Sequence, residues 1–381
     1  MKKNIMLLIG YLKNGGAEHS IVKLANELSK YHNVILVVAS KRNQDYECYV
    51  PIIEVKEFSN KLTKLFGIIN LKKLKKEYHI DTTISYTSEY NFYNVISKYK
   101  DKTIISIRNH LSTKKERKIE RMMHRISIRL CDRIVCCSNS VMIDQIKNFH
   151  ANSKKTCVIP NFCNLKEIEA KVNEKIDIED KKYITDNMIV SIARLVPQKG
   201  HEHIIRAMNL VVKENKNAKL LLFSRGPLKE KLEELVKSLH LENNIYFMDF
   251  HPNPYLFLKQ AKCFILASKY EGMPNVILEA MACNTPVIAT DAPGGSKELL
   301  MDECDYNTRC NSIIESDYGV LIPPFSSNES IREKQEEDVA NLILKFLTDN
   351  KFNKYYQLKS KERIKDYSST KIIKKWLKII G

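Results

Sequence analysis

Short apolar stretches alternate with amphipathic stretches along most of the chain, and this alternation limits the possible fold more than any other feature. In the first half, the apolar runs are residues 4–12, 33–40, 84–88, 103–109, 133–138 and 156–161. A strand that is apolar throughout is buried on both faces, which is typical of a parallel sheet covered by helices. The pattern therefore predicts an α/β fold built from repeated strand–helix units.

The alternation stops and restarts near the middle of the chain, which predicts two domains. A chain of 381 residues is also longer than one ordinary hydrophobic core supports. We predict two doubly wound Rossmann-like domains that face each other across a cleft. Their expected limits are a first domain at 1–165, a charged linker at 166–187, a second domain at 188–350, and basic C-terminal helices at 351–381 that pack back onto the first domain.

Positive charge is concentrated at the two ends of the chain. The net charge of +17 divides into +15 for residues 1–165, −6 for 166–350 and +8 for 351–381. An anionic partner explains this asymmetry, and a solvated lysine-rich surface is the simpler alternative. Residues 60–78 and 112–130 interleave basic and apolar residues at helical spacing, which favours an anionic membrane surface over nucleic acid.

The sequence predicts a cytoplasmic protein without a membrane-spanning helix. No stretch approaches the roughly 18 consecutive apolar residues that such a helix needs. The run at 4–12 is followed by a Gly-Gly turn and has no signal-peptide cleavage site. The ten cysteines are irregularly placed and lack metal-binding spacing, so we expect reduced thiols.

Two basic residues follow the first apolar run of the second half. Arg194 and Lys199 lie on one predicted strand-to-helix turn, which ends at Gly200. A guanidinium and an ammonium group together suit phosphate oxygens, and the glycine lets backbone approach closely. Solvated basic residues at a strand end are the alternative interpretation.

Two glutamates, Glu271 and Glu279, lie eight positions apart around the start of a predicted helix. Carboxylates accept hydrogen bonds from sugar hydroxyls, whereas the backbone amides around Met273, Asn275 and Val276 suit a phosphate at the helix N-terminus. This arrangement predicts a site for a nucleotide-sugar diphosphate, with one carboxylate on the hexose and the other on the ribose. The chain contains no Asp-x-Asp pair to hold a divalent metal on the diphosphate, so we expect a metal-independent mechanism without a cofactor.

Two weaker signals lie in the first half. Gly15 and Gly16 follow the first apolar run and open a predicted helix, where paired glycines let a diphosphate or an acceptor approach backbone amides. His110 follows the run at 103–109, a position from which it can bond a sugar hydroxyl or assist proton transfer. A structural turn and a structural histidine are the alternatives.

Several motifs together resemble the family-4 glycosyltransferases of the GT-B fold, a group of retaining enzymes that use sugar nucleotides. The matching segments are GGAE at 15–18, IPN at 159–161, ARLVPQKG at 193–200, EGMPNVILEAMACNTPVIATDAPGG at 271–295 and GVLIPP at 319–324. They follow the family order over nearly the whole chain. The sequence departs from the family where Gly-x-Gly-Pro is replaced by Ser224-Arg225-Gly226-Pro227, and where Asp249 replaces a glycine.

The resemblance implies roles for individual residues. Arg194 and Lys199 would bind the donor diphosphate, Glu271 would contact the hexose, and Glu279 would contact the ribose. The implied catalytic residues are His110, Arg194, Lys199 and Glu271. The implied donor-binding residues are Gly15, Gly16, Arg194, Lys199, Gly226, Glu271, Gly272, Met273, Pro274, Asn275, Val276, Ile277 and Glu279.

The same resemblance implies a retaining hexosyltransferase of bacterial surface-polysaccharide synthesis, such as capsule or O-antigen. It would move a hexose or N-acetylhexosamine from a nucleotide sugar, with UDP as the family's usual nucleotide, to a glycan acceptor on polyprenyl diphosphate. The first domain would receive the acceptor, at the inner face of the plasma membrane and without contact to nucleic acid. A sugar-nucleotide epimerase and a basic protein that binds membranes or nucleic acid are the alternatives.

Overall fold

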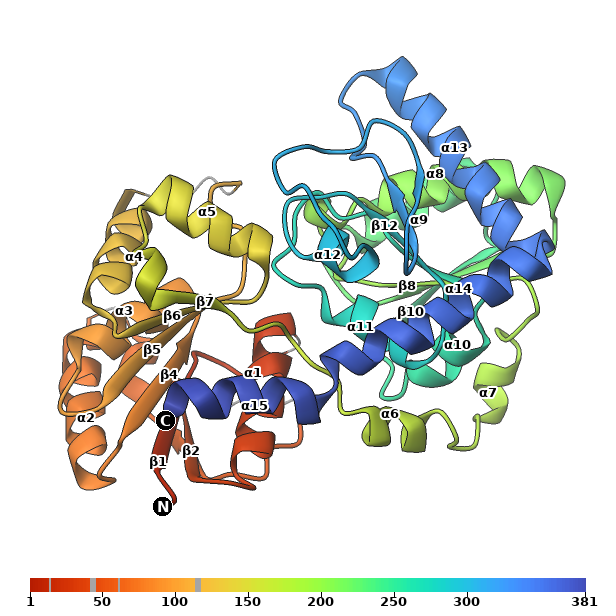
Figure 1. Ribbon diagram of the computed structural model, residues 1–381. Helices are drawn as coiled ribbons and strands as arrows, with labels where there is room; N and C mark the ends of the chain where they lie inside the picture. The colour runs from red at the N-terminus through yellow and green to blue at the C-terminus, as the bar shows by residue number, and fades with distance from the viewer. Residues whose placement is uncertain (14, 42–45, 61, 114–117) are drawn as a thin grey trace. The chain divides into compact units, whose positions relative to one another are not determined.

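The computed structural model describes the chain except residues 14, 42–45, 61 and 114–117 (Figure 1). The chain forms two compact units. The first consists of Met1–Phe162 and Ser369–Gly381, and the second of Cys163–Ser368. Both follow the doubly wound pattern that the alternation predicts.

The first unit is built on a seven-stranded sheet with the order β3-β2-β1-β4-β5-β6-β7, in which every pairing is parallel. Its strands are β1 Asn4–Leu8, β2 Asn33–Val38, β3 Ile52–Glu54, β4 Thr82–Tyr86, β5 Lys102–Ile107, β6 Arg133–Cys136 and β7 Thr156–Val158. Its helices are α1 Gly16–Leu28, α2 Lys64–Glu77, α3 Ser88–Ile96, α4 Lys118–Leu130, α5 Asn139–Phe149 and α15 Ser369–Ile380, with short 3₁₀ turns η1 Lys56–Ser59 and η2 Ser153–Lys155.

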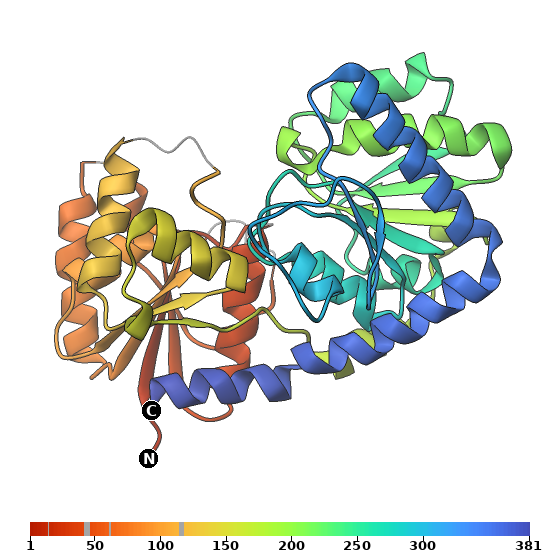
Figure 2. The same cartoon turned by 45° about the horizontal axis from the view of Figure 1, so that its top comes forward.

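Strand β1 shows why the apolar runs have no polar face. Ile5 and Leu7 belong to the core that packs against α1 and α15, whereas Met6 and Leu8 belong to the core under α2 and α3. Successive side chains of a strand point to opposite faces, so both faces of this strand need apolar residues. Figures 1 and 2 show helices on both faces of the sheet.

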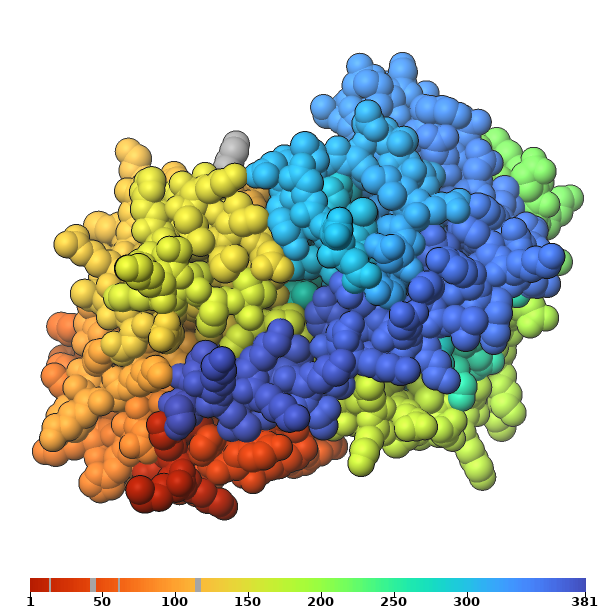
Figure 3. All heavy atoms as spheres, viewed as in Figure 1, coloured from red at the N-terminus to blue at the C-terminus, as the bar shows by residue number. Residues whose placement is uncertain are grey.

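The last helix of the chain, α15, completes the first unit. It buries Ile372, Ile373 and Trp376 in the same core as Ile5 and Leu7. Lys3 Nζ donates to the carbonyl of Ile380 (3.0 Å), and Lys102 Nζ donates to the carbonyl of Ile379 (2.6 Å). Lysines are favourable partners for the unpaired carbonyls that end a helix. Figure 3 shows the end of the chain against residues near the N-terminus.

The second unit contains a seven-stranded sheet with the order β10-β9-β8-β11-β12-β14-β13, parallel except between β13 and β14. Its strands are β8 Met188–Ile192, β9 Lys219–Phe223, β10 Ile245–Asp249, β11 Cys263–Leu266, β12 Val287–Thr290, β13 Ile314–Glu315 and β14 Val320–Ile322. Its helices are α6 Leu165–Lys171, α7 Ile178–Lys181, α8 His201–Glu214, α9 Lys229–Ser238, α10 Tyr255–Gln260, α11 Asn275–Ala282, α12 Ser296–Leu300, α13 Glu329–Thr348 and α14 Asn350–Arg363, with 3₁₀ turns η3 Pro197–Lys199 and η4 Ile364–Tyr367.

The limits of the units differ from the predicted ones at both ends of the second unit. The predicted linker at 166–187 forms α6 and α7, which belong to the second unit because Asn253 Nδ2 donates to the carbonyl of Lys171 (2.8 Å) and His251 pairs with Asp180 (3.0 Å). Of the predicted C-terminal segment at 351–381, only α15 belongs to the first unit.

Helix α14 stays with the second unit because it packs there. Tyr356 is buried in the core of that unit, and Asn353 Nδ2 donates to the carbonyl of Lys262 (2.7 Å). Arg363, the last residue of the helix, donates to the carbonyls of Glu298 (2.7 Å) and Leu299 (3.1 Å). The basic C-terminal segment is therefore divided between the two units.

The two predicted basic helices are shorter than the sequence pattern suggested. The stretch at 60–78 forms α2 from Lys64, and the stretch at 112–130 forms α4 from Lys118. Residues 61 and 114–117 of these predicted helices lie outside the described residues. Leu111 and Ser112 donate their backbone amides to Asp144 instead of entering a helix (2.9 and 3.4 Å).

Candidate functional site

The strand order of the second unit identifies where a ligand would bind. The chain winds outward in one direction from β8 through β9 to β10, and in the other direction from β11 through β12. Doubly wound sheets bind ligands at the carboxyl ends of the strands where the direction reverses. In this unit that point lies between β8 and β11, which Lys199 and Glu271 respectively follow.

Backbone hydrogen bonds join three turns at this edge of the sheet. The turn after β8 meets the turn after β11, because Lys269 N donates to the carbonyl of Gln198 (2.8 Å) and Gln198 Nε2 donates to the carbonyl of Tyr270 (2.7 Å). The turn after β11 meets the turn after β12 through the bond from Glu271 N to the carbonyl of Pro293 (2.8 Å). Three segments that are distant in sequence thus form one surface.

Lys199 and Glu271 contact each other on this surface. Lys199 Nζ donates to Glu271 Oε1, and the side chains of Lys199 and Glu271 are 14% and 10% exposed. A largely desolvated ion pair holds both groups in fixed positions while leaving each accessible from one side. The structure therefore brings together two of the residues selected from the sequence.

Two glycines allow these turns to approach. Gly200 has φ +61°, and a Cβ atom at this position would lie 2.4 Å from the carbonyl oxygen of Ala267. Gly294 has φ +129°, and a Cβ atom there would lie 2.3 Å from the carbonyl oxygen of Glu271. Any other residue would have to separate the turns, so the site depends on glycine at both positions.

Arg194 and Gly226 lie around the same turn. Arg194 is exposed. Gly226 lies in a loop that is hydrogen-bonded to Leu195. Leu195 N donates to the carbonyl of Arg225 (3.1 Å), and Leu228 N donates to the carbonyl of Leu195 (3.0 Å). Among the described residues, Arg194 has no side-chain partner. Its exposed guanidinium is accessible to an anion.

His201 is a residue of this site that the sequence analysis missed. Its Nε2 lies 3.1 Å from the carbonyl of Ala193, next to Arg194, and the residue is almost fully buried. Burial lowers the pKa of His201, although bonds to backbone carbonyls partly oppose this effect. The neutral imidazole therefore donates to the turn and fixes its conformation. The one available signal was a histidine directly after Lys-Gly at the start of a helix.

Glu279 lies in the second turn of α11, close to Tyr255. Both Glu271 and Glu279 are more than 90% buried. The pKa of Tyr255 is raised by its own burial first and by the charge of Glu279 second. Pro274 is the residue directly before Asn275, the first residue of α11.

The two departures from the family pattern occur where backbone has positive φ. Asp249, which stands where family members usually carry glycine, has φ +49°, and Ser224 has φ +156°. Asp249 Oδ1 accepts a bond from Lys229 Nζ (2.9 Å). Aspartate tolerates the left-handed conformation better than most residues, so the turn is retained without glycine.

In the first unit, Gly15 and His110 are held by neighbouring side chains. Gly15 N donates to the hydroxyl of Tyr46 (3.1 Å). His110 Nδ1 lies 3.3 Å from Ser112 Oγ and 3.8 Å from the buried carboxylate of Asp144. The 3.8 Å separation from Asp144 exceeds hydrogen-bonding distance, so Ser112 Oγ is the nearer neighbour of Nδ1. Gly16 is the exposed first residue of α1.

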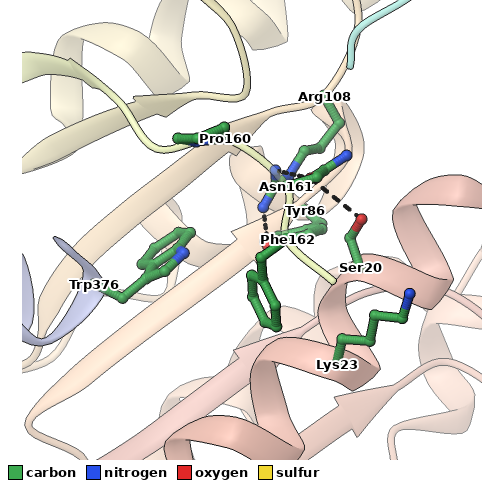
Figure 4. A pocket seen from close by; sticks show the side chains of 8 residues that line it. All are labelled: Ser20, Lys23, Tyr86, Arg108, Pro160, Asn161, Phe162 and Trp376. Atoms are coloured by element: carbon green, nitrogen blue, oxygen red, sulfur yellow. Dashed lines mark hydrogen bonds between the residues drawn. The ribbon is translucent and has the colours of Figure 1, made fainter. Parts of the chain in front are cut away.

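A small pocket, lined by both polar and aromatic side chains, lies at the same sheet edge of the first unit as His110 (Figure 4). Arg108 packs on the ring of Tyr86 (4.0 Å) and donates to Asn161 Oδ1 (2.7 Å) and to the Tyr86 hydroxyl. Ser20 Oγ donates to the same oxygen of Asn161 (3.3 Å). Asn161 belongs to the IPN motif, so these contacts give that motif a structural role.

The described residues contain no group of three or more His, Cys, Asp and Glu side chains that could hold a metal ion. Within the same residues, no helix is both long and apolar enough to cross a membrane. The ten cysteines are free thiols.

Each of the two units matches a known protein family. Residues 172–364 match the family described as "Glycosyl transferases group 1", and residues 14–167 match "Glycosyltransferase Family 4".

Named relatives are also glycosyltransferases. An uncharacterized glycosyltransferase of Methanocaldococcus jannaschii, MJ1059, is 34% identical over 61% of this chain and 59% of its own length. The N-acetylgalactosamine-N,N'-diacetylbacillosaminyl-diphospho-undecaprenol 4-alpha-N-acetylgalactosaminyltransferase of Campylobacter jejuni is 27% identical over 98% of both chains.

Solved structures share the fold over the whole chain. Alr3699/HepE of Anabaena, in complex with UDP-glucose, has a TM-score of 0.80 at 16% identity and covers 99% of both chains. TarM of S. aureus has a TM-score of 0.74 at 15% identity and covers 100% of both chains. The prediction of two Rossmann-like units is thereby confirmed. The chain belongs to the group 1 glycosyl transferases.

Proposed function

We propose that this protein is a metal-independent, retaining glycosyltransferase that moves a hexose or N-acetylhexosamine from a UDP-sugar to a glycan carried on polyprenyl diphosphate. The observation that carries this proposal is the Lys199–Glu271 pair at the reversal point of the second sheet. In this pair, the Lys199 ammonium group can bind phosphate and the Glu271 carboxylate can bind sugar hydroxyls. The two residues lie on turns that follow the neighbouring strands β8 and β11.

The names of the relatives support the choice of substrates. The Campylobacter jejuni relative that matches almost the whole chain acts on a sugar linked to diphospho-undecaprenol, and a second one, 26% identical over 99% of this chain, is named for transfer of N-acetyl-D-galactosamine to a PP-undecaprenol-linked glycan. The Anabaena structure with the same fold holds UDP-glucose. These properties, taken together, motivate the proposed donor and acceptor.

The reaction follows from the charges on the site. Negative charge grows on the diphosphate as the bond between its oxygen and the sugar's anomeric carbon breaks. Arg194 and Lys199 stabilise that charge, so they act on the transition state more than on the bound substrate. Glu271 accepts bonds from hexose hydroxyls, and Glu279 accepts bonds from the ribose. The departing phosphate takes the proton of the acceptor hydroxyl, so the retaining reaction needs no protein nucleophile.

The first unit contributes His110, as a catalytic residue, and the Gly15–Gly16 turn, as a donor-binding segment, to this proposal. His110 Nδ1 lies 3.3 Å from Ser112 Oγ, and the ring can bond an acceptor or donor hydroxyl. The turn at Gly15 opens α1 directly after β1, next to the reversal point of the first sheet between β1 and β4. The turn therefore lies where this sheet would bind a ligand, and His110 follows β5 at the same carboxyl edge.

The test is a product analysis. The protein is incubated with UDP-sugars and a short-chain polyprenyl-diphosphate glycan, and free UDP, the lipid-linked product and its anomeric configuration are measured. We expect UDP release matched by glycan extension with an α linkage from an α donor. An epimerised UDP-sugar without free UDP would identify an epimerase, and a β linkage would contradict retention.

We further propose that the first unit binds an anionic membrane surface at the cytoplasmic face. Helices α2 and α4 expose large apolar side chains beside basic ones. The exposed apolar residues are Leu65, Phe66, Ile69, Ile119 and Met122. Lys72, Lys73, Arg121 and Arg125 are exposed on the same two helices. Apolar side chains that enter the lipid boundary and cations that face acidic headgroups are the usual means of such binding.

Sedimentation with vesicles tests this proposal. We expect binding to vesicles that contain phosphatidylglycerol, weaker binding in high salt, and little binding to neutral vesicles. Replacing Phe66 and Met122 by serine should reduce binding, whereas replacing the exposed Leu358 of α14 by serine serves as the matched control. Equal binding to neutral and acidic vesicles, or selective binding to RNA or DNA instead, would contradict it.

A further inference from the structure

A loop of the second unit, residues 301–313, is fastened to the turn that follows β12, and we call it the strap. It connects α12 to β13. Lys297 is almost fully buried beneath it and donates to the carbonyls of Asp305 and Thr308 (3.1 Å each). The same ammonium pairs with Asp291 Oδ2 (2.9 Å). One buried lysine therefore ties the strap to the residue that directly follows β12.

The other side of the strap also meets Asp291. Cys310 N donates to Asp291 Oδ2 (2.8 Å), and Arg309 Nη1 lies 3.4 Å from Asp291 Oδ1. Two cations, Lys297 and Arg309, thus share one fully buried carboxylate, which leaves an excess of one positive charge. The Arg309 side chain is 27% exposed, and its Nη2 and Nε groups have no partner among the described residues.

The strap lies on a defined side of Glu271. The turn that begins at Asp291 touches Glu271 through the bond to the Pro293 carbonyl (2.8 Å) and through the close approach of Gly294. In the sheet order, β12 lies beyond β11 on the side away from β8. The Lys199 turn follows β8, so the turn that holds Arg309 and the turn that carries Lys199 follow strands on opposite sides of β11.

We propose that the strap selects the donor sugar and that Arg309 is the specificity-determining residue, donating hydrogen bonds to an oxygen on the transferred hexose. This inference rests on the proposed function, in which Glu271 holds the hexose and Lys199 holds the diphosphate. A group beyond Glu271, on the side away from the diphosphate, then faces the sugar. A guanidinium group only donates, so it favours a sugar that presents a hydroxyl or acetamido oxygen to it.

The experiment compares donor selectivity in Arg309→Gln and the wild type. The values of kcat/KM are measured for UDP-glucose, UDP-galactose and their N-acetylated counterparts, and the affinity for UDP alone is measured by calorimetry. We expect the ratio of kcat/KM between the preferred sugar and its best competitor to fall by a factor of ten or more, with UDP affinity unchanged. Arg332→Gln is the matched control, because Arg332 is similarly exposed and pairs with Glu329 on α13.

The outcomes separate this inference from the proposed function. If the wild type bound neither UDP nor any UDP-sugar, the proposed function itself would fail. If the wild type transferred sugar and Arg309→Gln left every ratio within twofold, the role of Arg309 would be refuted. A loss of UDP affinity in Arg309→Gln would also refute it, because the residue would then serve the nucleotide. A thermal unfolding curve establishes that the variant is folded.

Discussion

The Lys199 ammonium contacts the Glu271 carboxylate although the two residues lie 72 positions apart in the sequence. The contact exists because β8 and β11 are neighbours in the sheet and because glycines let their turns meet.

Replacing Lys199 by methionine should lower kcat more than it raises KM. The lysine bonds a leaving group whose charge grows in the transition state, and the loss is about 2–4 kcal/mol, or roughly 30- to 1,000-fold in rate. Steady-state kinetics with saturating acceptor measure it. Lys269→Met is the control, because Lys269 is on the neighbouring turn but is half exposed. An unchanged kcat would remove Lys199 from the mechanism.

Gly200 should not tolerate a side chain. Two factors disfavour a side chain here: the backbone φ of +61°, and the 2.4 Å distance that a Cβ atom would have from the carbonyl oxygen of Ala267. Two variants distinguish these factors. Gly200→Ala suffers from both, whereas Gly200→Asn tolerates the positive φ but still carries a Cβ atom. We expect both variants to lose more than about 1 kcal/mol of unfolding free energy in urea titrations. A fully stable Asn variant would show that only φ matters.

Asp249 also has a positive φ, so its replacements should differ in stability. At φ +49°, glycine costs less backbone energy than alanine. We expect Asp249→Gly to be more stable than Asp249→Ala by about 1 kcal/mol in chemical denaturation, because both lose the bond from Lys229 and only the alanine is strained. Equal stabilities would contradict the left-handed conformation.

A buried ion pair in the first unit should make stability depend on pH. Lys75 and Asp101 are fully buried with Nζ and Oδ2 2.9 Å apart. Burial lowers the pKa of Lys75 to about 8, although Asp101 partly opposes this. Between pH 8 and 10.5 the unfolded chain then binds more protons than the folded chain, so stability should rise with pH in this window.

The unfolding free energy of the wild type is compared with that of the double variant Lys75→Met/Asp101→Asn. The difference in unfolding free energy between wild type and variant should move in favour of the wild type by up to about 1.4 kcal/mol per pH unit from pH 8 to 10.5. It should level off as the pH falls below the pKa of Lys75. A difference that is flat across the whole range would mean that Lys75 keeps its proton.

The elements with clear end signals were predicted well from the sequence. Helices α5, at 139–149, and α11, at 275–282, each begin next to a residue typical of a helix start. Ser138 caps the first of them by accepting a bond from Val141 N, and Pro274 precedes the second. The turns that carry Lys199 and Glu271 were identifiable because each follows an apolar strand.

Other features depend on contacts that no local pattern encodes. The strap at 301–313 has no apolar periodicity, and it is ordered by buried Lys297, whose partners are backbone carbonyls. The charged segment at 166–187 resembled a linker, but bonds from Asn253 and His251 hold it on the second unit. His201 was missed because a single histidine at a helix start carries no distinctive spacing.

The most direct test of the whole account is calorimetric titration of the protein with UDP-sugars in the presence of excess EDTA. The account predicts binding of at least one UDP-sugar by the wild type, with an affinity that the chelator leaves unchanged and that falls in the double variant Arg194→Gln/Lys199→Met. Failure to bind any UDP-sugar, or binding that appears only when Mg²⁺ is restored, would contradict a donor site that relies on cationic side chains and backbone amides.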